Sequence, residues 1–224
     1  MAIAALYDVH GMVQALDAVL AEPDVASADV IVIGGDVAAG PFPRETLERL
    51  RELGDRALWV RGNADRELGG WTREQLRDEE IAFLQDLPRG QTLGRVQFCH
   101  ATPRSDEEIL TAISPEDAWL EAFAAVDASL VVAGHTHMQL DRMVGDVRFV
   151  NAGSVGMPYE DEVVAFWTLI AGDDVEFRKT LFDIDRTAAE IEVSGWPGAQ
   201  EFVAENLFVA PSRDEATQLF ESWR

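Results

Sequence analysis

Four histidines are the residues of this sequence best suited to carry chemistry. Each follows a short apolar run, or follows an aspartate that does so: His10, His100, His135 and His137. Three further polar residues share this placement, namely Asp8, Asp36 and Asn63. All seven side chains offer oxygen or imidazole nitrogen, which suits Mn²⁺, Fe, Zn²⁺, Ni²⁺ or Co²⁺ rather than an iron–sulfur cluster. Seven ligands exceed the needs of one tetrahedral ion, so the set predicts two ions that share a bridging carboxylate.

Each of these residues also has a simpler interpretation. A single histidine after a strand is more often a surface or core residue than a ligand, but here all four fall in one ordered set. Asp8 and Asp36 could cap the helices that follow them. Asn63 could serve only as a turn residue after Gly62. The helix-cap interpretation leaves His10 unexplained, which favours the metal site.

The elements that must position these residues are short apolar runs. Such runs are typical of strands buried on both faces, and they precede the polar residues at 2–7, 30–33, 57–60, 95–99 and 130–133. The run 95–99 forms a predicted hairpin with residues 91–93 around Gly94. In α/β sheets, ligand sites gather beyond the carboxyl ends of the strands. We therefore expect the seven residues to converge in one crevice.

Helical patterns separate the early strands. Helices are predicted over residues 12–21, after Pro43, and around Ile81 and Leu84 up to Pro88. The later strands follow one another instead, at 138–143, 146–150, 163–170 and 174–182. This order predicts an α/β fold with two packed mixed β-sheets flanked by helices.

Two connections have weaker patterns. Residues 65–77 and 101–113 are each expected to be a loop with a short helix. Ser114 is predicted to cap the next helix, with Pro115 at its first position. The apolar face of that helix is expected to comprise Trp119, Leu120, Phe123 and Val126.

The chain is predicted to divide into a main domain, residues 1–183, and a helical C-terminal extension, residues 184–224, packed on that domain. Ser212 and Glu215 form a capping box for a final helix. The aromatic residues expected to pack the extension onto the main domain are Trp196, Phe208 and Trp223.

The amino-acid composition limits which binding partners and which compartment are expected for this protein. A net charge of −23 and a pI near 4.3 disfavour binding to nucleic acid or to anionic membranes. No run approaches the roughly 20 apolar residues of a membrane span. The single cysteine, Cys99, excludes an internal disulfide and fits a reducing compartment. We expect a cytoplasmic protein; the sequence leaves the oligomeric state open.

The order of the motifs resembles that of the calcineurin-like metallophosphoesterases. It comprises Asp8-Val9-His10, Gly35-Asp36, Gly62-Asn63-Ala64-Asp65, His100 and Gly134-His135-Thr136-His137. The resemblance covers roughly residues 1–170 and is greatest to the small bacterial and archaeal phosphodiesterase branch. It implies the four-layer αββα sandwich of that family, in agreement with the pattern of the elements.

The resemblance also implies a role for each residue. Asp8, His10 and His137 would bind the first metal ion. Asn63, His100 and His135 would bind the second. Asp36 would bridge the two ions, and Asp36 and Asn63 would position the metals and the phosphate. A hydroxide bridging the ions, with Mn as the expected metal, would attack a small soluble phosphoester.

One position departs from the family pattern. Many members have a histidine after the asparagine, where it resembles a general acid; here this residue is Ala64. Its absence argues most strongly against phosphoprotein phosphatase activity. Arg66 and Asn151 are predicted to contact substrate, although a solvated arginine and a plain turn are simpler interpretations. The alternative function is a non-catalytic protein-interaction scaffold on the same fold.

Overall fold

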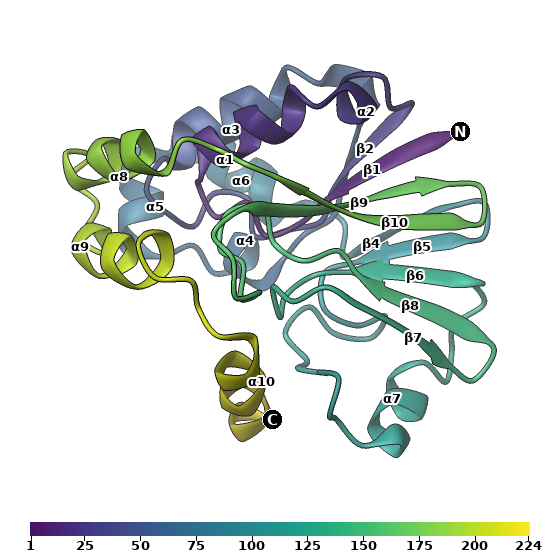
Figure 1. Cartoon of the computed structure of the whole chain (residues 1–224). Coiled ribbons are helices and arrows are strands. Elements are labelled where there is room, and N and C mark those ends of the chain that lie inside the picture. The colour runs from purple at the N-terminus through teal and green to yellow at the C-terminus, as the bar shows by residue number, and fades with distance from the viewer.

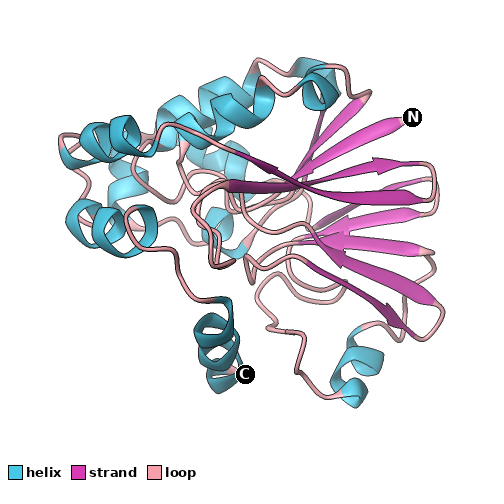
Figure 2. Ribbon diagram, viewed as in Figure 1, coloured by secondary structure: helices cyan, strands magenta, loops and turns pink.

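Two five-stranded sheets pack face to face in the computed structural model, which describes residues 1–224 (Figures 1 and 2). The strand order of the first sheet is β10-β9-β1-β2-β3. Its strands are β1 (Ala2–Leu6), β2 (Val30–Ile33), β3 (Ala57–Trp59), β9 (Ala165–Ala171) and β10 (Asp174–Thr180). β1, β2 and β3 run parallel, and β9 and β10 are antiparallel additions. This sheet is therefore mixed, as the sequence predicted.

The second sheet has the order β4-β5-β6-β8-β7. Its strands are β4 (Gly90–Leu93), β5 (Val96–Cys99), β6 (Leu130–Ala133), β7 (Leu140–Val144) and β8 (Val147–Asn151). β5, β6 and β8 run parallel, while β4 and β7 pair antiparallel with their neighbours. Both sheets thus have a parallel centre, whose strands end at one edge.

β1 shows why its sequence is apolar without interruption. Successive strand residues point to opposite faces, so both faces of a central strand need apolar side chains. Ile3 and Ala5 join a cluster with Val132 and Val150 of the second sheet. Ala4 and Leu6 belong to the larger cluster beneath the helices. The strand is consequently buried between two layers.

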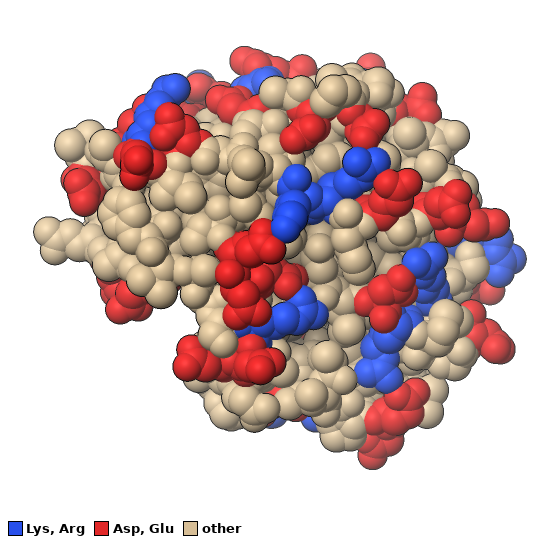
Figure 3. Space-filling model, in the orientation of Figure 1, with Lys and Arg blue, Asp and Glu red and all other residues tan.

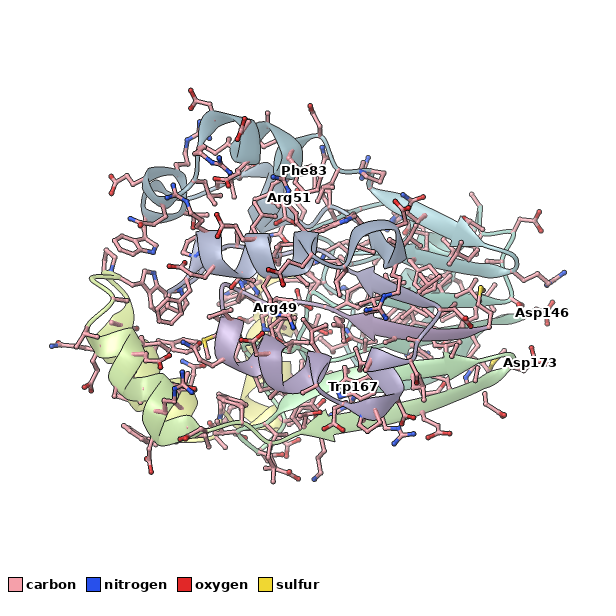
Figure 4. The ribbon with its side chains drawn as sticks, turned by 90° about the horizontal axis from the view of Figure 1, so that it is seen from above. Arg49, Arg51, Phe83, Asp146, Trp167 and Asp173 are labelled. Atoms are coloured by element: carbon pink, nitrogen blue, oxygen red, sulfur yellow. The ribbon has the colours of Figure 1, made fainter.

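Most helices cover the outer face of the first sheet (Figure 1). Above the strands lie α1 (Val13–Leu20), α2 (Pro23–Ala26), α3 (Pro43–Arg51) and α6 (Asp78–Gln85), and α5 (Gly70–Gln75), α8 (Ile184–Glu192) and α9 (Ala199–Phe202) continue this layer beyond the strand ends. The short α4 (Asn63–Arg66) lies at the strand ends themselves. Figure 4 looks onto this layer, in which Arg49 of α3 pairs with Asp17 of α1 at 2.7 Å and Arg51 lies over the Phe83 ring of α6. None of the helices combines the length and the apolar character that crossing a bilayer requires.

A single helix, α7 (Glu116–Ala122), covers the outer face of the second sheet. Trp119 and Phe123 pack there against Phe149, as expected, whereas Leu120 is 48% exposed. The prediction that Ser114 caps this helix was wrong: Pro115 is the N-cap, and the Ser114 hydroxyl accepts the Thr111 N–H instead. No helix forms over residues 101–113, because that segment closes turns around a Thr102–Ser105 bridge.

The C-terminal segment divides into a packed part and an exposed part. α8, α9 and the π-helical segment Val203–Leu207 contribute Ile191, Phe202 and Leu207 to the core beneath the helices. The final helix, α10 (Arg213–Trp223), has no buried residue, although Ser212 caps it as predicted. The prediction that Phe208 and Trp223 pack onto the main domain was wrong, since they are 58% and 62% exposed. Trp196 does pack against the core.

Candidate metal centre

The carboxyl ends of the parallel strands bring the predicted ligands together. Asp8 and His10 follow β1, Asp36 follows β2, and Asn63 opens α4 after β3. The second sheet supplies its residues after β5 and β6: His100, His135 and His137. Because the two sheets face each other, these loops meet at one edge of the sandwich. Neither Asp8 nor Asp36 caps the helix that follows it, since α1 and α3 begin after Met12 and Phe42.

One group of side chains comprises Asp8, His10 and His137. Their ligand atoms lie within 4.8 Å of one another. The Nε2 atoms of His10 and His137 are 3.1 Å apart, and His137 Nε2 is 3.4 Å from Asp8 Oδ1. Two imidazole nitrogens and a carboxylate oxygen therefore converge on one point.

A second group comprises Asp8, Asp36 and His100, again within 4.8 Å. His100 Nε2 lies 3.5 Å from Asp36 Oδ2 and 3.0 Å from Asn63 Oδ1. The His135 ring lies 5.2 Å from the His100 ring, centroid to centroid. Asp36 Oδ2 is also 3.7 Å from His10 Nε2, so this carboxylate lies between the two groups.

The backbone at these residues is unusual. Six residues other than glycine have a left-handed backbone, and five of them are Asp8 (φ 52°), His10 (φ 48°), Asp36 (φ 51°), His135 (φ 69°) and His137 (φ 58°). A side chain disfavours this conformation, which concentrates at functional sites where the surrounding structure enforces it. The coincidence of this backbone with the predicted ligands supports the candidate site independently of the motif.

Carbonyl oxygens orient three of the imidazoles. The Nδ1 atoms of His10, His100 and His137 lie 3.1, 2.9 and 2.6 Å from the carbonyl oxygens of Ala39, Gly34 and Met157. A carbonyl only accepts, so each Nδ1 must carry the hydrogen. In a neutral ring, Nε2 then presents its lone pair to the site, as metal-binding histidines do.

The donor set fits divalent cations. Asp8 Oδ1 and His135 Nε2 are buried without a hydrogen-bond partner. The facing Nε2 lone pairs of His10 and His137 repel unless a proton or a cation lies between them. Buried acceptors without donors are rare in proteins. Cations would satisfy these atoms, and no protein donor does.

Charge interactions within the site perturb its titration. Burial alone would lower the pKa of His100, but the Asp36 carboxylate and then Asp8 raise it to about 10. Burial would raise the pKa of Asp36, but His100 and His10 hold it well below its usual value. Burial and the neighbouring His100 lower the pKa of His135 to about 4. A cation bound at His100 would therefore compete with a proton, because the same carboxylates would stabilise both.

Asp65 is a residue of the site to which the sequence reasoning assigned no role. Its buried carboxylate accepts hydrogen bonds from the backbone N–H groups of Asp36 (2.8 Å), Val37 (2.9 Å) and Gly62 (2.9 Å). Burial and the nearby Asp36 raise its pKa to about 7. The sequence feature that could have revealed this role of Asp65 is its place at the end of the motif Gly62-Asn63-Ala64-Asp65. Asp65 ties the loop after β2 to the loop after β3.

Close packing requires glycine at two points of these loops. A Cβ at Gly62 would lie 2.1 Å from Asp36 Oδ1, and a Cβ at Gly134 would lie 2.3 Å from Asp8 Oδ2. Both distances are shorter than any real contact. The glycines therefore allow the backbone to approach the two carboxylates.

The two predicted substrate contacts are engaged elsewhere. Asn151 is buried, its amide donates to Gly134 O (2.6 Å) and Thr136 Oγ1 (3.0 Å), and its oxygen accepts from Gly153 N. This geometry favours holding the histidine loop over contacting a substrate. The Arg66 guanidinium donates to the carboxylates of Asp106 and Glu107, both at 2.7 Å. A phosphate would have to compete with these carboxylates.

Comparisons with known proteins agree with this geometry. The sequence model of the calcineurin-like phosphoesterase superfamily domain matches residues 1–172. The phosphodiesterase YfcE of Escherichia coli K12 is 28% identical over 162 residues, which cover 67% of this chain and 77% of YfcE.

Two solved structures share the fold over almost the whole chain. The metallophosphoesterase from Sphaerobacter thermophilus is 27% identical, with a TM-score of 0.80 over 94% of this chain and 100% of its own. The hypothetical protein PH1004 from Pyrococcus horikoshii is 19% identical, with a TM-score of 0.79 over 90% of this chain and 97% of its own. The expected sandwich of two mixed sheets flanked by helices is therefore confirmed.

Proposed function

This chain belongs to the calcineurin-like phosphoesterase superfamily, and we propose that it is a metal-dependent phosphodiesterase acting on a small soluble phosphoester. The observation that carries this proposal is the convergence of side chains from five strand ends: five residues form the two compact groups, and Asn63 and His135 lie beside His100. Five of these residues adopt a left-handed backbone, which supports a functional constraint. The phosphodiesterase name of YfcE supports the choice of a diester.

The proposed ligand sets follow the two groups of side chains. Asp8, His10 and His137 would hold the first divalent cation. Asn63, His100 and His135 would hold the second. Asp36 would contact both cations, which its position between His10 and His100 supports. Manganese is the proposed metal; Fe, Zn, Ni and Co suit the same donors.

When bound, two divalent cations supply Lewis acidity, which lowers the pKa of water and neutralises charge on phosphoryl oxygens. The residues of the chain set the geometry. The carbonyls of Ala39, Gly34 and Met157 hold three imidazoles with Nε2 toward the centre. The Ala64 N–H holds Asp36 through Oδ1 at 2.8 Å, which leaves Oδ2 for the centre.

No side chain is proposed as the nucleophile. Cys99 is buried, and burial raises the pKa of its thiol to about 12, so its thiolate is not accessible at neutral pH. Ala64 has no proton to give a leaving group. Esters whose alcohols leave readily are therefore the proposed preference.

The setting of the proposed reaction follows from composition. The single cysteine supports a reducing compartment, for which the cytoplasm is our proposal. The net charge of −23 supports a small substrate over nucleic acid, because a polyanion would be repelled.

The test uses metal-stripped protein and bis-p-nitrophenyl phosphate, with Mn²⁺ added back. Activity should return with Mn²⁺ and fall by on the order of 100-fold or more in Asp36→Asn, because cation binding supplies several kcal/mol of transition-state stabilisation. Asp55→Asn, an exposed aspartate away from the site, is the matched control. Protein with full metal content that hydrolyses the ester no faster than Asp36→Asn would refute the proposal.

A non-catalytic scaffold is the second candidate. The exposed apolar residues of the C-terminal extension favour the scaffold function: Phe208, Val209, Leu219 and Trp223. Such residues often mark protein-binding surfaces. Under this function, Asp36→Asn and the unchanged protein would be equally inactive at full metal content, while Phe208→Ala would weaken capture of a protein partner.

A further inference from the structure

A pocket of about 420 Å³ lies between the C-terminal segment and the loop that carries Tyr159. Its apolar wall comprises Tyr159, Leu219, Phe220 and Trp223. The lining also contains the carboxylates of Glu205 and Glu215. The function proposed above makes no use of this pocket.

Tyr159 joins the pocket to the candidate metal centre. Its ring stacks on the His137 imidazole, with centroids 5.1 Å apart and planes inclined by 17°. Its backbone N–H donates to the His137 carbonyl at 3.2 Å. His137 is a proposed ligand of the first cation, so the pocket begins one aromatic ring away from the reacting centre.

Helix α10, which supplies Leu219, Phe220 and Trp223 to the apolar wall, is held at both ends by polar contacts. Arg213 at its start donates to the Gln139 carbonyl at 2.6 Å and pairs with Glu160. Glu221 near its end accepts from Thr111 Oγ1 at 2.6 Å. No α10 residue is buried, so its apolar side chains are not needed for the core. The helix presents them to the pocket instead.

The electrostatics of the pocket favour a cation. The rings of Tyr159, Phe220 and Trp223 are successive neighbours, with centroids 5.9 and 5.5 Å apart. Aromatic faces carry negative charge and attract organic cations. The lining contains two carboxylates and no lysine or arginine, and acidic side chains lie over α10 in Figure 3. A phosphoryl group would be repelled here and drawn to the cations of the metal centre.

We propose that this pocket binds the alcohol moiety of a phosphodiester when that moiety carries an organic cation, such as a quaternary ammonium. The inference rests on the proposed phosphodiesterase function, with the phosphoryl group at the metal centre. Glu205 and Glu215 attract the positive charge, and the three aromatic rings contact its methyl groups. Hydrolysis itself is ordinary: water adds to phosphorus, the P–O bond to the other alcohol breaks, and a proton goes to that alcohol.

Three p-nitrophenyl diesters test the proposal with Mn²⁺-loaded full-length protein. The second alcohol is choline, its uncharged isostere 3,3-dimethylbutanol, or methanol. We expect kcat/KM for the choline ester to exceed that for the dimethylbutyl ester by on the order of tenfold. Trp223→Ala and Glu215→Gln should bring this ratio close to one. Val193→Ala, at an exposed residue of the C-terminal extension outside the pocket, should preserve it.

Binding measurements test whether the pocket takes an organic cation even if no ester is hydrolysed. Choline should produce a saturable change in tryptophan fluorescence, 3,3-dimethylbutanol should not, and the change should be lost in Trp223→Ala. Glu215→Gln, which retains every tryptophan, should weaken choline binding measured by calorimetry. Melting curves of the variants check that each is folded.

The outcomes separate the two proposals. Hydrolysis of the methyl ester with a choline-to-dimethylbutyl ratio near one overturns the pocket and leaves the phosphodiesterase function standing. Preference for thymidine 5′-p-nitrophenyl phosphate over the choline ester also overturns it, because the pocket then takes a flat neutral ring. Choline binding without hydrolysis of any ester refutes the phosphodiesterase function and the role of the pocket in substrate selection, and leaves only a site for an organic cation. Absence of choline binding refutes the pocket whatever the activity.

Discussion

The left-handed residues of the metal centre are held against their own preference. A side chain in this conformation costs about 1–2 kcal/mol, although aspartate, asparagine and histidine tolerate it better than most. Polar contacts enforce the conformation: the His135 N–H donates to Asp8 Oδ2 at 2.8 Å, and the Asp8 carbonyl accepts from Ser154 Oγ at 2.8 Å. The ligand atoms are therefore placed before any cation arrives, which lowers the entropy lost on binding.

This strain predicts that glycine at position 135 gives a more stable protein than alanine, the reverse of the usual order. In metal-free protein, His135→Gly should be more stable than His135→Ala by about 1 kcal/mol, because glycine adopts φ 69° without a Cβ penalty. Urea unfolding of the two variants measures the difference. The matched pair is His100→Gly and His100→Ala, since His100 is buried but is not among the left-handed residues. There alanine should be the more stable; the same order at both positions would contradict the strain argument.

At the scale of the elements, strand ends alone do not place the ligands, because the loops after them must also be fixed to one another. Asp65 does this between the loops after β2 and β3, with three backbone N–H donors on one carboxylate. Asn151 does it in the second sheet, between the end of β8 and the loop after β6. Both residues hold proposed ligands in place without themselves belonging to the proposed ligand set.

Replacing Asp65 by asparagine should therefore loosen the site. An amide has one acceptor oxygen and turns an NH₂ group toward a backbone N–H, so at least one buried donor loses its partner, at about 1–3 kcal/mol. We expect that loss of unfolding free energy in denaturant titrations, together with weaker Mn²⁺ binding by calorimetry. Asp55→Asn serves as the exposed control. Unchanged stability and unchanged metal affinity would show that Asp65 is dispensable.

At the scale of the whole molecule, the C-terminal extension, residues 184–224, does not form a separate layer. Ile191, Phe202 and Leu207 belong to the same core as β1 and α1. α10 contributes nothing to that core and instead borders the pocket beside the metal centre. The division of the chain after residue 183 remains a prediction, and the burial of these side chains argues that α8 and α9 are needed for the main fold.

Two truncations distinguish these contributions. Removing residues 213–224 should lower the free energy of unfolding only slightly, because no buried side chain is lost. Removing residues 184–224 should prevent stable folding, since each of Ile191, Phe202 and Leu207 contributes about 1.5–3 kcal/mol by burial. Thermal unfolding followed by circular dichroism measures both. A cooperative transition near that of the intact chain in the longer truncation would support two separable units.

The sequence by itself determined the fold class and the candidate residues. Uninterrupted apolar runs predict strands with two covered faces, and polar residues directly after such runs can only lie at the edge of the sheet. The spacing of His135 and His137 and the order of the motifs were sufficient to select seven residues, which the fold then brings close together. These signals are local, so they can be read without knowing what packs against them.

The tertiary structure decided what each remaining residue touches. Ser114 has the sequence of a helix cap, but contacts with Thr111 and Glu221 draw its hydroxyl away. Trp223 and Phe208 are aromatic, yet the fold leaves them 62% and 58% exposed. The sequence suggested that Asn151 and Arg66 could contact a substrate. In the fold, Asn151 donates to the Gly134 carbonyl, and Arg66 donates to the Asp106 carboxylate. Side-chain partners, strained backbone and the pocket beside Tyr159 all depend on segments distant in sequence, and only folding brings those segments into contact.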